Sequence, residues 1–187
     1  MNLLWSNIFR KKPEEESLAF FLGMVPVFSE LEGRELTFLE SLVHIRRYSS
    51  RETVFEGGDT GSGMYVIRTG KVEIFLRDAE GREELLALLG PGDFFGETTL
   101  TAPTSRTASA RTLESAELLG LFRADLLETV ERHPGIASKI LLGLTHIISE
   151  RLQATGQEIR RLQAAAAACA APAETDSDEG SDESLKQ

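Results

Sequence analysis

Residues 44–122 combine short runs of β-branched and aromatic residues with regularly spaced turn residues, and this pattern limits the folds open to the chain. Ten of its 16 glycines fall here, at positions 57, 58, 61, 63, 70, 81, 90, 92, 96 and 120. Short strands broken at such regular intervals are typical of an antiparallel barrel or jelly roll. We therefore predict an α+β fold built on an antiparallel β-roll, a double-stranded jelly roll.

Two turns of this roll are indicated by their residues. Arg68–Lys71 is predicted to be a hairpin turn, because apolar residues alternate with polar ones on both sides of its glycine. Asp78–Gly81 is predicted to be the next turn.

Helices are predicted on both sides of the roll. Before it, residues 13–22 begin with a proline and three acids, which suit a helix start, and Ser29–Leu42 carries leucines at helical spacing. Val25–Phe28 is expected to be an extended link. After the roll, we expect a helix over Ala124–His133 and a long helix from Ile136 to about Ala168.

The long helix carries an apolar stripe at alternating steps of four and three residues, formed by Ile148, Leu152, Thr155, Ile159 and Leu162. That spacing is typical of a coiled-coil seam with one polar position. We favour a homodimer through this seam, since a helix of roughly 45 Å is too long for so small a barrel to cover. The alternative is that the stripe packs on the chain's own barrel.

The stretch Gly92–Ala110 carries the residues most suited to chemistry. Gly96 allows a tight turn, and a short helix start after it would point free N–H groups at an anion. Arg106 can hold a phosphate with two parallel hydrogen bonds. The Glu97 carboxylate would repel a nearby phosphate unless it accepted a hydrogen bond, and a sugar hydroxyl is a suitable donor. The stretch therefore predicts a site for a ribose phosphate.

The run Phe95-Gly96-Glu97 followed by Arg106-Thr107-Ala108-Ser109 resembles the phosphate-binding cassette of cyclic nucleotide-binding domains. The resemblance implies that Glu97 binds the ribose 2′-hydroxyl and Arg106 the cyclic phosphate. It gives as candidate ligand-binding residues Gly96, Glu97, Thr98, Thr99, Arg106, Thr107 and Ala108. The chain departs from the family pattern at Ser105, usually proline, and at Thr98 and Thr99, usually apolar or small.

The choice of base depends on two threonines. In the resemblance, a threonine at the position of Thr107 is typical of cyclic-GMP-dependent kinases. Some channels with the same Arg-Thr pair, here Arg106-Thr107, nevertheless prefer cyclic AMP. Residues 151–158 resemble the helix segment that contacts adenine in the bacterial cyclic-AMP receptors of this family. Thr155 matches a threonine of that segment, and Gly156 stands where the segment has a serine. We expect cyclic AMP to be favoured over cyclic GMP; Thr155 as a tolerated coiled-coil residue is the alternative.

Composition excludes several other classes. A net charge of −10 argues against a nucleic-acid partner. The single cysteine, Cys169, suits a reducing cytoplasm. No run is long enough to cross a membrane, and residues 1–12, apolar then basic, are expected to form a short packing helix, with attachment to an anionic membrane as the alternative. The three histidines form no metal-ligand spacing and no catalytic group is evident.

The resulting organisation is a helical lead-in at 1–28, a cyclic nucleotide-binding domain with its long helix at 29–168, and a disordered acidic tail at 169–187. The tail leaves no room for the helix-turn-helix of the family's transcription factors. We therefore expect a stand-alone cytoplasmic sensor of cyclic AMP or cyclic GMP that regulates a partner protein. The alternatives are an assembly protein with a vestigial pocket and an enzyme of cyclic nucleotide turnover, for which catalytic groups are missing.

Overall fold

The computed structural model describes residues 17–170, and its amino-terminal part is helical. The elements are α1 (Leu18–Gly23), the 3-10 helix η2 (Pro26–Phe28) and α2 (Arg34–Leu42). Ser17 caps α1 by accepting a hydrogen bond from the Phe20 N–H at 3.0 Å. The earlier part of the predicted helix 13–22, the segment 1–12 and the acidic tail from residue 171 lie outside the described residues.

Two local predictions for this region are wrong. The expected extended link at Val25–Phe28 contains η2, for which Pro26 provides a fixed φ at the first position. The helix expected from Ser29 begins only at Arg34, because Gly33 before it has a φ of 44°, which is outside helical geometry.

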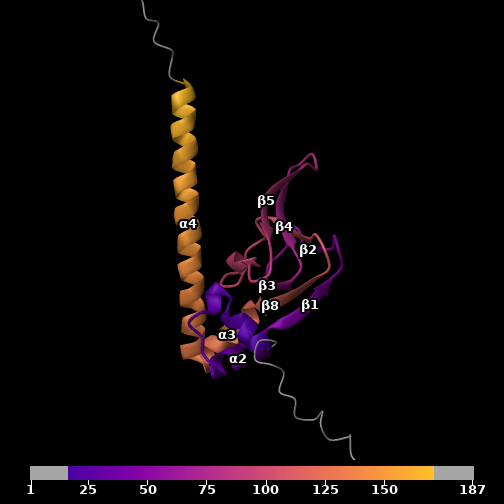
Figure 1. The fold of residues 1–187 in the computed structure, drawn as a ribbon, viewed down its shortest axis with the longest axis vertical. Coiled ribbons are helices and arrows are strands. Elements are labelled where there is room, and N and C mark those ends of the chain that lie inside the picture. Colours follow the sequence, from indigo (N-terminus) through magenta and orange to yellow (C-terminus); the bar gives the residue numbers. More distant parts are fainter. Residues whose placement is uncertain (1–16, 171–187) are drawn as a thin grey trace, which may run out of the picture. The chain divides into compact units, whose positions relative to one another are not determined.

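Eight strands follow and form two antiparallel four-stranded sheets (Figure 1). The strands are β1 (His44–Tyr48), β2 (Thr53–Phe55), β3 (Gly63–Thr69), β4 (Val72–Arg77), β5 (Glu83–Leu89), β6 (Phe94–Phe95), β7 (Ser109–Thr112) and β8 (Ala116–Phe122). The first sheet has the order β1-β8-β3-β6 and the second the order β2-β7-β4-β5. The predicted jelly roll between residues 44 and 122 is therefore confirmed.

The turn at Arg68–Lys71 is not the predicted hairpin. β3 pairs with β8 and β6, whereas β4 pairs with β5 and β7, so the turn carries the chain from one sheet to the other. Gly70 makes this corner possible, with a φ of 87° and no space for a Cβ, which would lie 2.7 Å from the Ser115 carbonyl oxygen. The prediction for Asp78–Gly81 is confirmed: it joins β4 to β5 as a hairpin.

Both faces of the first sheet are buried at its central strands, β3 and β8, whereas the edge strand β1 is largely exposed. On β8, Leu119 and Leu121 pack in a cluster with the helices, while Leu118 packs in a second cluster between the two sheets. The alternation follows from the two-residue period of a strand. The second cluster forms the interior of the roll and comprises Ile67, Val72, Phe95, Ala110, Ala116 and Leu118, with partly buried residues around them.

The chain returns to helix after β8, in α3 (Arg123–Arg132) and α4 (Pro134–Ala170). Both predicted helices exist, but α4 begins at Pro134, two residues earlier than expected, since proline is well suited to a first helical position. Ile140 and Leu144 of α4 pack in the helical cluster. Gly143 lets α4 approach η2 closely, because a Cβ there would meet the Val27 carbonyl oxygen.

The chain divides into two compact units, the first ending at Ile148 and the second beginning at Ser149. Within residues 17–170, the second unit consists of the remainder of α4. The apolar residues of the predicted seam are exposed, from 44% for Ile148 to 71% for Leu152. No helix of residues 17–170 is both long enough and apolar enough to cross a membrane.

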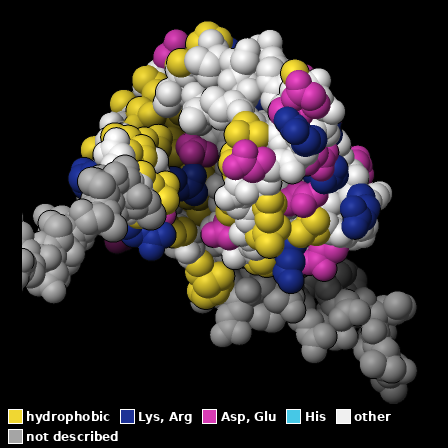
Figure 2. Space-filling view, turned by 90° about the horizontal axis from the view of Figure 1, so that it is seen from above, with side chains coloured by type: hydrophobic (Ala, Val, Ile, Leu, Met, Phe, Trp, Pro, Cys, Tyr) yellow, Lys and Arg dark blue, Asp and Glu magenta, His cyan; other side chains and the backbone are white. Residues whose placement is uncertain are grey.

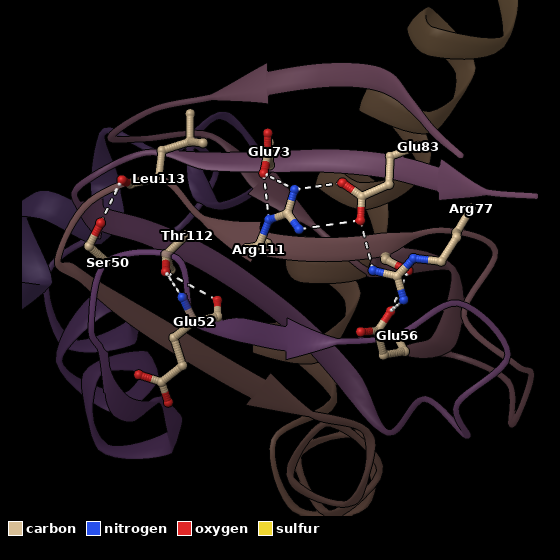
Figure 3. Close-up of polar contacts among 10 residues, drawn as sticks. Ser50, Glu52, Glu56, Glu73, Arg77, Glu83, Arg111, Thr112 and Leu113 are labelled. Atoms are coloured by element: carbon tan, nitrogen blue, oxygen red, sulfur yellow. Dashed lines mark hydrogen bonds and ion pairs between the residues drawn. The ribbon is translucent and has the colours of Figure 1, made fainter. Parts of the chain in front are cut away.

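An ionic network covers the outer face of the second sheet (Figure 3). Arg111 lies between Glu73 and Glu83, with its nearest nitrogens 2.6 and 2.8 Å from their carboxylates. Arg77 continues the network by binding Glu83 at 2.8 Å and Glu56 at 3.3 Å. Figure 2 likewise shows acidic and basic side chains lying beside one another on the surface. The network ties β4, β5 and β7 to the loop that follows β2.

Candidate functional site

The cassette predicted around Gly96 lies between β6 and β7. Gly96 has left-handed backbone geometry, with a φ of 78°, and precedes the 3-10 helix η3 (Glu97–Thr99). The expected single turn of helix is thus present, in its tighter 3-10 form. Glycine at 96 suits this conformation and also leaves room for Arg106, because a Cβ would lie 2.4 Å from its Nη1 and would displace the guanidinium.

Arg106 lies against this turn and is only 7% exposed. Its Nη1 donates to the Gly96 carbonyl oxygen at 3.0 Å and to the Thr99 hydroxyl at 2.9 Å. Its guanidinium carbon lies 4.0 Å from the centroid of the Phe55 ring, which is the geometry of a cation–π contact. The guanidinium is therefore held at one end and supported on one face.

The electrostatics of Arg106 favour an anionic ligand. Burial lowers the pKa of its guanidinium, while Tyr65, Asp59 and Glu97 act in the opposite direction. No carboxylate of residues 17–170 forms an ion pair with it. A buried cation without a bound carboxylate is a favourable place for a phosphate.

The backbone of the loop after β2 is tied to the cassette. The Gly58 N–H donates to the Arg106 carbonyl oxygen at 2.9 Å, and the Arg106 N–H donates to the Asp59 carbonyl oxygen at 2.8 Å. Ser109, the last residue of the cassette, accepts a hydrogen bond from the Gly57 N–H at 2.9 Å through its hydroxyl. These bonds hold the glycine loop beside Arg106.

A pocket of about 490 Å³ opens beside the cassette. It is lined by the glycine loop, by the segment after Arg106 and by the end of β4, through Glu56, Gly57, Gly58, Phe75, Leu76, Arg77, Asp78, Arg106, Thr107, Ala108 and Ser109. Thr107 is exposed and Ala108 half-buried, so both offer surface to a ligand.

The remaining predicted site residues differ in their surroundings. Gly96, Thr99 and Arg106 are in mutual contact. Glu97 is half-buried and Thr98 is exposed, both on η3. Thr155 belongs to the second unit, where it is exposed and donates to the Arg151 carbonyl oxygen at 2.9 Å. Its part in the site stays a prediction.

Two residues at the site were not foreseen. Phe55, which supports Arg106, has the same strand context as the other aromatic residues of the roll, so no signal distinguished it. Gly61 belongs to the glycine-rich loop, but its packing against Thr99 depends on a contact between distant segments. Among the described residues, no group of three or more His, Cys, Asp or Glu side chains could hold a metal ion.

The roll consists of two antiparallel sheets and carries the glycine-to-arginine cassette between β6 and β7. These two features define a small-ligand-binding domain of the jelly-roll class. Residues 45–133 match the family model of the cyclic nucleotide-binding domain. The chain belongs to this family, which confirms the resemblance found in its sequence.

Similar proteins include transcriptional regulators. A cyclic AMP receptor protein of Thermus thermophilus is 37% identical over 134 residues, covering 72% of this chain and 60% of that protein. A CRP-like cAMP-activated global transcriptional regulator of Mycobacterium tuberculosis is 30% identical over 141 residues, covering 75% of this chain and 61% of that protein. The chain thus spans about 60% of the length of these relatives.

The fold has a close counterpart among solved structures. The crystal structure of the Thermus thermophilus catabolite activator protein superposes with a TM-score of 0.67 and 36% identity, over 74% of this chain and 63% of that one. The two-sheet roll with flanking helices is therefore a fold that this chain shares with the catabolite activator protein.

Proposed function

We propose that this chain is a cyclic nucleotide sensor that binds cyclic AMP in preference to cyclic GMP, in the cytoplasm, and regulates a partner protein. The observation that carries the proposal is the state of Arg106, a buried guanidinium fixed by Nη1 beside a left-handed glycine. Such a group offers charge-assisted, two-point binding to a phosphate. The names of the relatives, which refer to cyclic AMP, support the choice of ligand.

Glu97 completes the proposed ligand-binding group. A carboxylate close to a bound phosphate is tolerable when it accepts a hydrogen bond from the ligand, and a ribose 2′-hydroxyl is such a donor. Binding would then tighten the cassette and favour one of two positions of α4, so that a partner surface is exposed or hidden. We propose that the chain acts as a homodimer through the stripe on α4.

A second candidate is an assembly protein whose pocket no longer binds a ligand. The observation that favours it is the exposed stripe of α4, with Leu152 71% and Leu162 58% exposed. Coverage of this stripe by a second copy requires no nucleotide.

Titration calorimetry with cyclic AMP and with cyclic GMP separates the two candidates. We expect the unaltered chain to bind cyclic AMP more tightly, and Arg106→Ala to weaken binding at least ~100-fold, the effect of two lost charge-assisted hydrogen bonds. Ser105→Ala, one residue away, is the matched control. No binding of either nucleotide would leave the assembly function, whereas affinity unchanged in Arg106→Ala would mean that Arg106 does not bind the phosphate.

A further inference from the structure

We propose that Thr99 is a positioning residue that holds Arg106 in the orientation needed for a ligand phosphate, and that Gly61 makes this possible. The inference rests on the proposed function, since it concerns the same site. It assigns to Thr99 an action through Arg106 rather than a contact with the nucleotide.

The hydroxyl of Thr99 both donates and accepts a hydrogen bond within the protein. Thr99 is fully buried. Its hydroxyl lies 3.2 Å from the Gly63 carbonyl oxygen and 3.1 Å from that of Gly96, to which it can donate its one hydrogen. It accepts from Nη1 of Arg106 at 2.9 Å. A buried hydroxyl with its donor and acceptor both engaged by the protein is a structural contact, not a free ligand-binding group.

The same geometry fixes which edge of the guanidinium is available. An arginine side chain has five N–H donors in a planar fork. The two on Nη1 are directed to Thr99 and Gly96, and within residues 17–170 Nε and Nη2 have no hydrogen-bond partner. No fully buried side-chain nitrogen or oxygen of the described residues is without a partner, so these two nitrogens reach solvent. The Nε–Nη2 edge is thus left open for the oxygens of a phosphate.

The space for Thr99 is provided by Gly61. A Cβ on Gly61 would lie 2.3 to 2.5 Å from three atoms of the Thr99 side chain, which no real contact allows. The backbone cannot easily move aside, because the Gly61 N–H donates to the Thr104 carbonyl oxygen at 3.1 Å. The φ of Gly61 is not positive, so glycine is required here for space and not for backbone conformation.

Pre-organisation explains how this contact would raise affinity. A free arginine side chain loses rotamer freedom when it binds a phosphate, whereas one held by Nη1 has already lost it. An alanine or glycine at position 99 would have no oxygen to reach Nη1. The departure from the family pattern noted at Thr99 therefore acquires a physical role in this chain.

The test is calorimetric titration of the full chain with cyclic AMP, with folding checked by thermal unfolding. Thr99→Val keeps the shape but removes the hydroxyl, and we expect roughly tenfold weaker binding, the effect of one lost hydrogen bond to a charged group. Thr99→Ser keeps the hydroxyl and should bind within about twofold of the unaltered chain. If Thr99→Val does not fold, Thr99→Ala removes the hydroxyl without adding volume and carries the same expectation.

An Arg106→Lys background isolates the contact, because lysine keeps the charge but has no Nη1. Thr99→Val should cause no further loss in this background. Gly61→Ala should weaken binding as Thr99→Val does, whereas Gly90→Ala is the matched control, since nothing lies within 4 Å of a Cβ there.

The outcomes separate the two levels of the proposal. No binding of cyclic nucleotide by the unaltered chain overturns the proposed function and this inference with it. Binding that is abolished by Arg106→Ala but unchanged in both Thr99→Val and Thr99→Ala overturns the positioning role alone. A loss that persists undiminished in the Arg106→Lys background would also overturn it, because Thr99 would then act without the guanidinium.

Discussion

The guanidinium carbon of Arg106 lies 4.0 Å from the centroid of the Phe55 ring. A cation over an aromatic face at a partly desolvated site contributes about 1 to 2 kcal/mol. The Phe55 ring also covers one flat face of the guanidinium, which the in-plane hydrogen bonds of Arg106 do not cover. Phe55 therefore links the second sheet of the roll to the candidate phosphate site.

We predict that Phe55→Leu weakens cyclic AMP binding by about five- to thirtyfold while the roll stays folded. The measurement is calorimetric titration, with circular dichroism to check the fold. Phe38→Leu is a suitable control, because Phe38 also makes a ring contact, with its centroid 4.4 Å from that of His133, but lies on α2 and does not line the pocket. It should reduce stability and leave affinity unchanged; equal losses of affinity in the two variants would contradict the prediction.

Glu97→Gln tests the ribose contact. The substitution keeps the size of the side chain but removes the charge that strengthens its hydrogen bond to a hydroxyl. We expect cyclic AMP affinity to fall roughly tenfold and that for 2′-deoxy cyclic AMP to change little. Equal losses for the two ligands would mean that Glu97 does not meet the 2′-hydroxyl.

The preference for the base is tested by a pair of substitutions. Thr107→Ala should weaken cyclic GMP binding several-fold, about one neutral hydrogen bond, and spare cyclic AMP. Thr155→Val should do the reverse. The measured quantity is the ratio of the two affinities, and a ratio unaffected by either substitution would show that neither threonine contacts the base.

The dimer is tested through the exposed stripe. A charge at the centre of an apolar seam is strongly unfavourable, so Leu152→Glu should convert a dimer to a monomer in light scattering. Gln153→Glu, at an exposed neighbouring position outside the stripe, is the matched control. Truncation before Ser149 should also give a monomer. A full-length chain that is monomeric at every protein concentration measured by light scattering would contradict the prediction.

The ionic network on the outer face predicts a pH dependence of stability. Hydrogen bonds from Arg111 and then Arg77 hold the pKa of Glu83 below its ordinary value of 4.5. The folded chain thus binds fewer protons at Glu83 than the unfolded chain, so the stabilisation is present above that value and is lost as pH falls through the lower, folded-state pKa.

We expect Glu83→Gln to lower the free energy of unfolding at neutral pH and to have progressively less effect as pH falls from about 5 to about 2. Urea unfolding of both proteins across this range measures the difference. Glu84→Gln, on the same strand, is the control. A difference that stays constant with pH would indicate that the ion pairs contribute no stability.

The sequence was sufficient to predict the roll, its limits at residues 44 and 122, and the cassette, because these depend on local patterns. It was not sufficient at Arg68–Lys71, where alternation around a glycine suits a hairpin and a corner between sheets equally well. What distinguishes them is the partner of each strand: β8 for β3 and β7 for β4. Such pairings join segments far apart in the chain.

The same limit applies to the site. The spacing of Gly96, Glu97 and Arg106 predicted a phosphate-binding group, and the structure places Gly96 and Arg106 in contact. Phe55 and Gly61 act on that group across a different loop and strand, which no local spacing indicates. Thr99 was predicted as a ligand contact, and its burial under Arg106 became visible only in three dimensions.

The pairing of β1 with β8 has a consequence for how the chain reaches its native state. His44 lies opposite Gly120, so the roll cannot close until nearly all of its residues are available. Folds dominated by pairings between distant segments form slowly, since the entropy of a large loop is lost before the contacts that offset it are made. During synthesis on the ribosome, β1 therefore waits without its partner until Phe122 has emerged, and the nascent chain is most open to aggregation and chaperone capture in that interval.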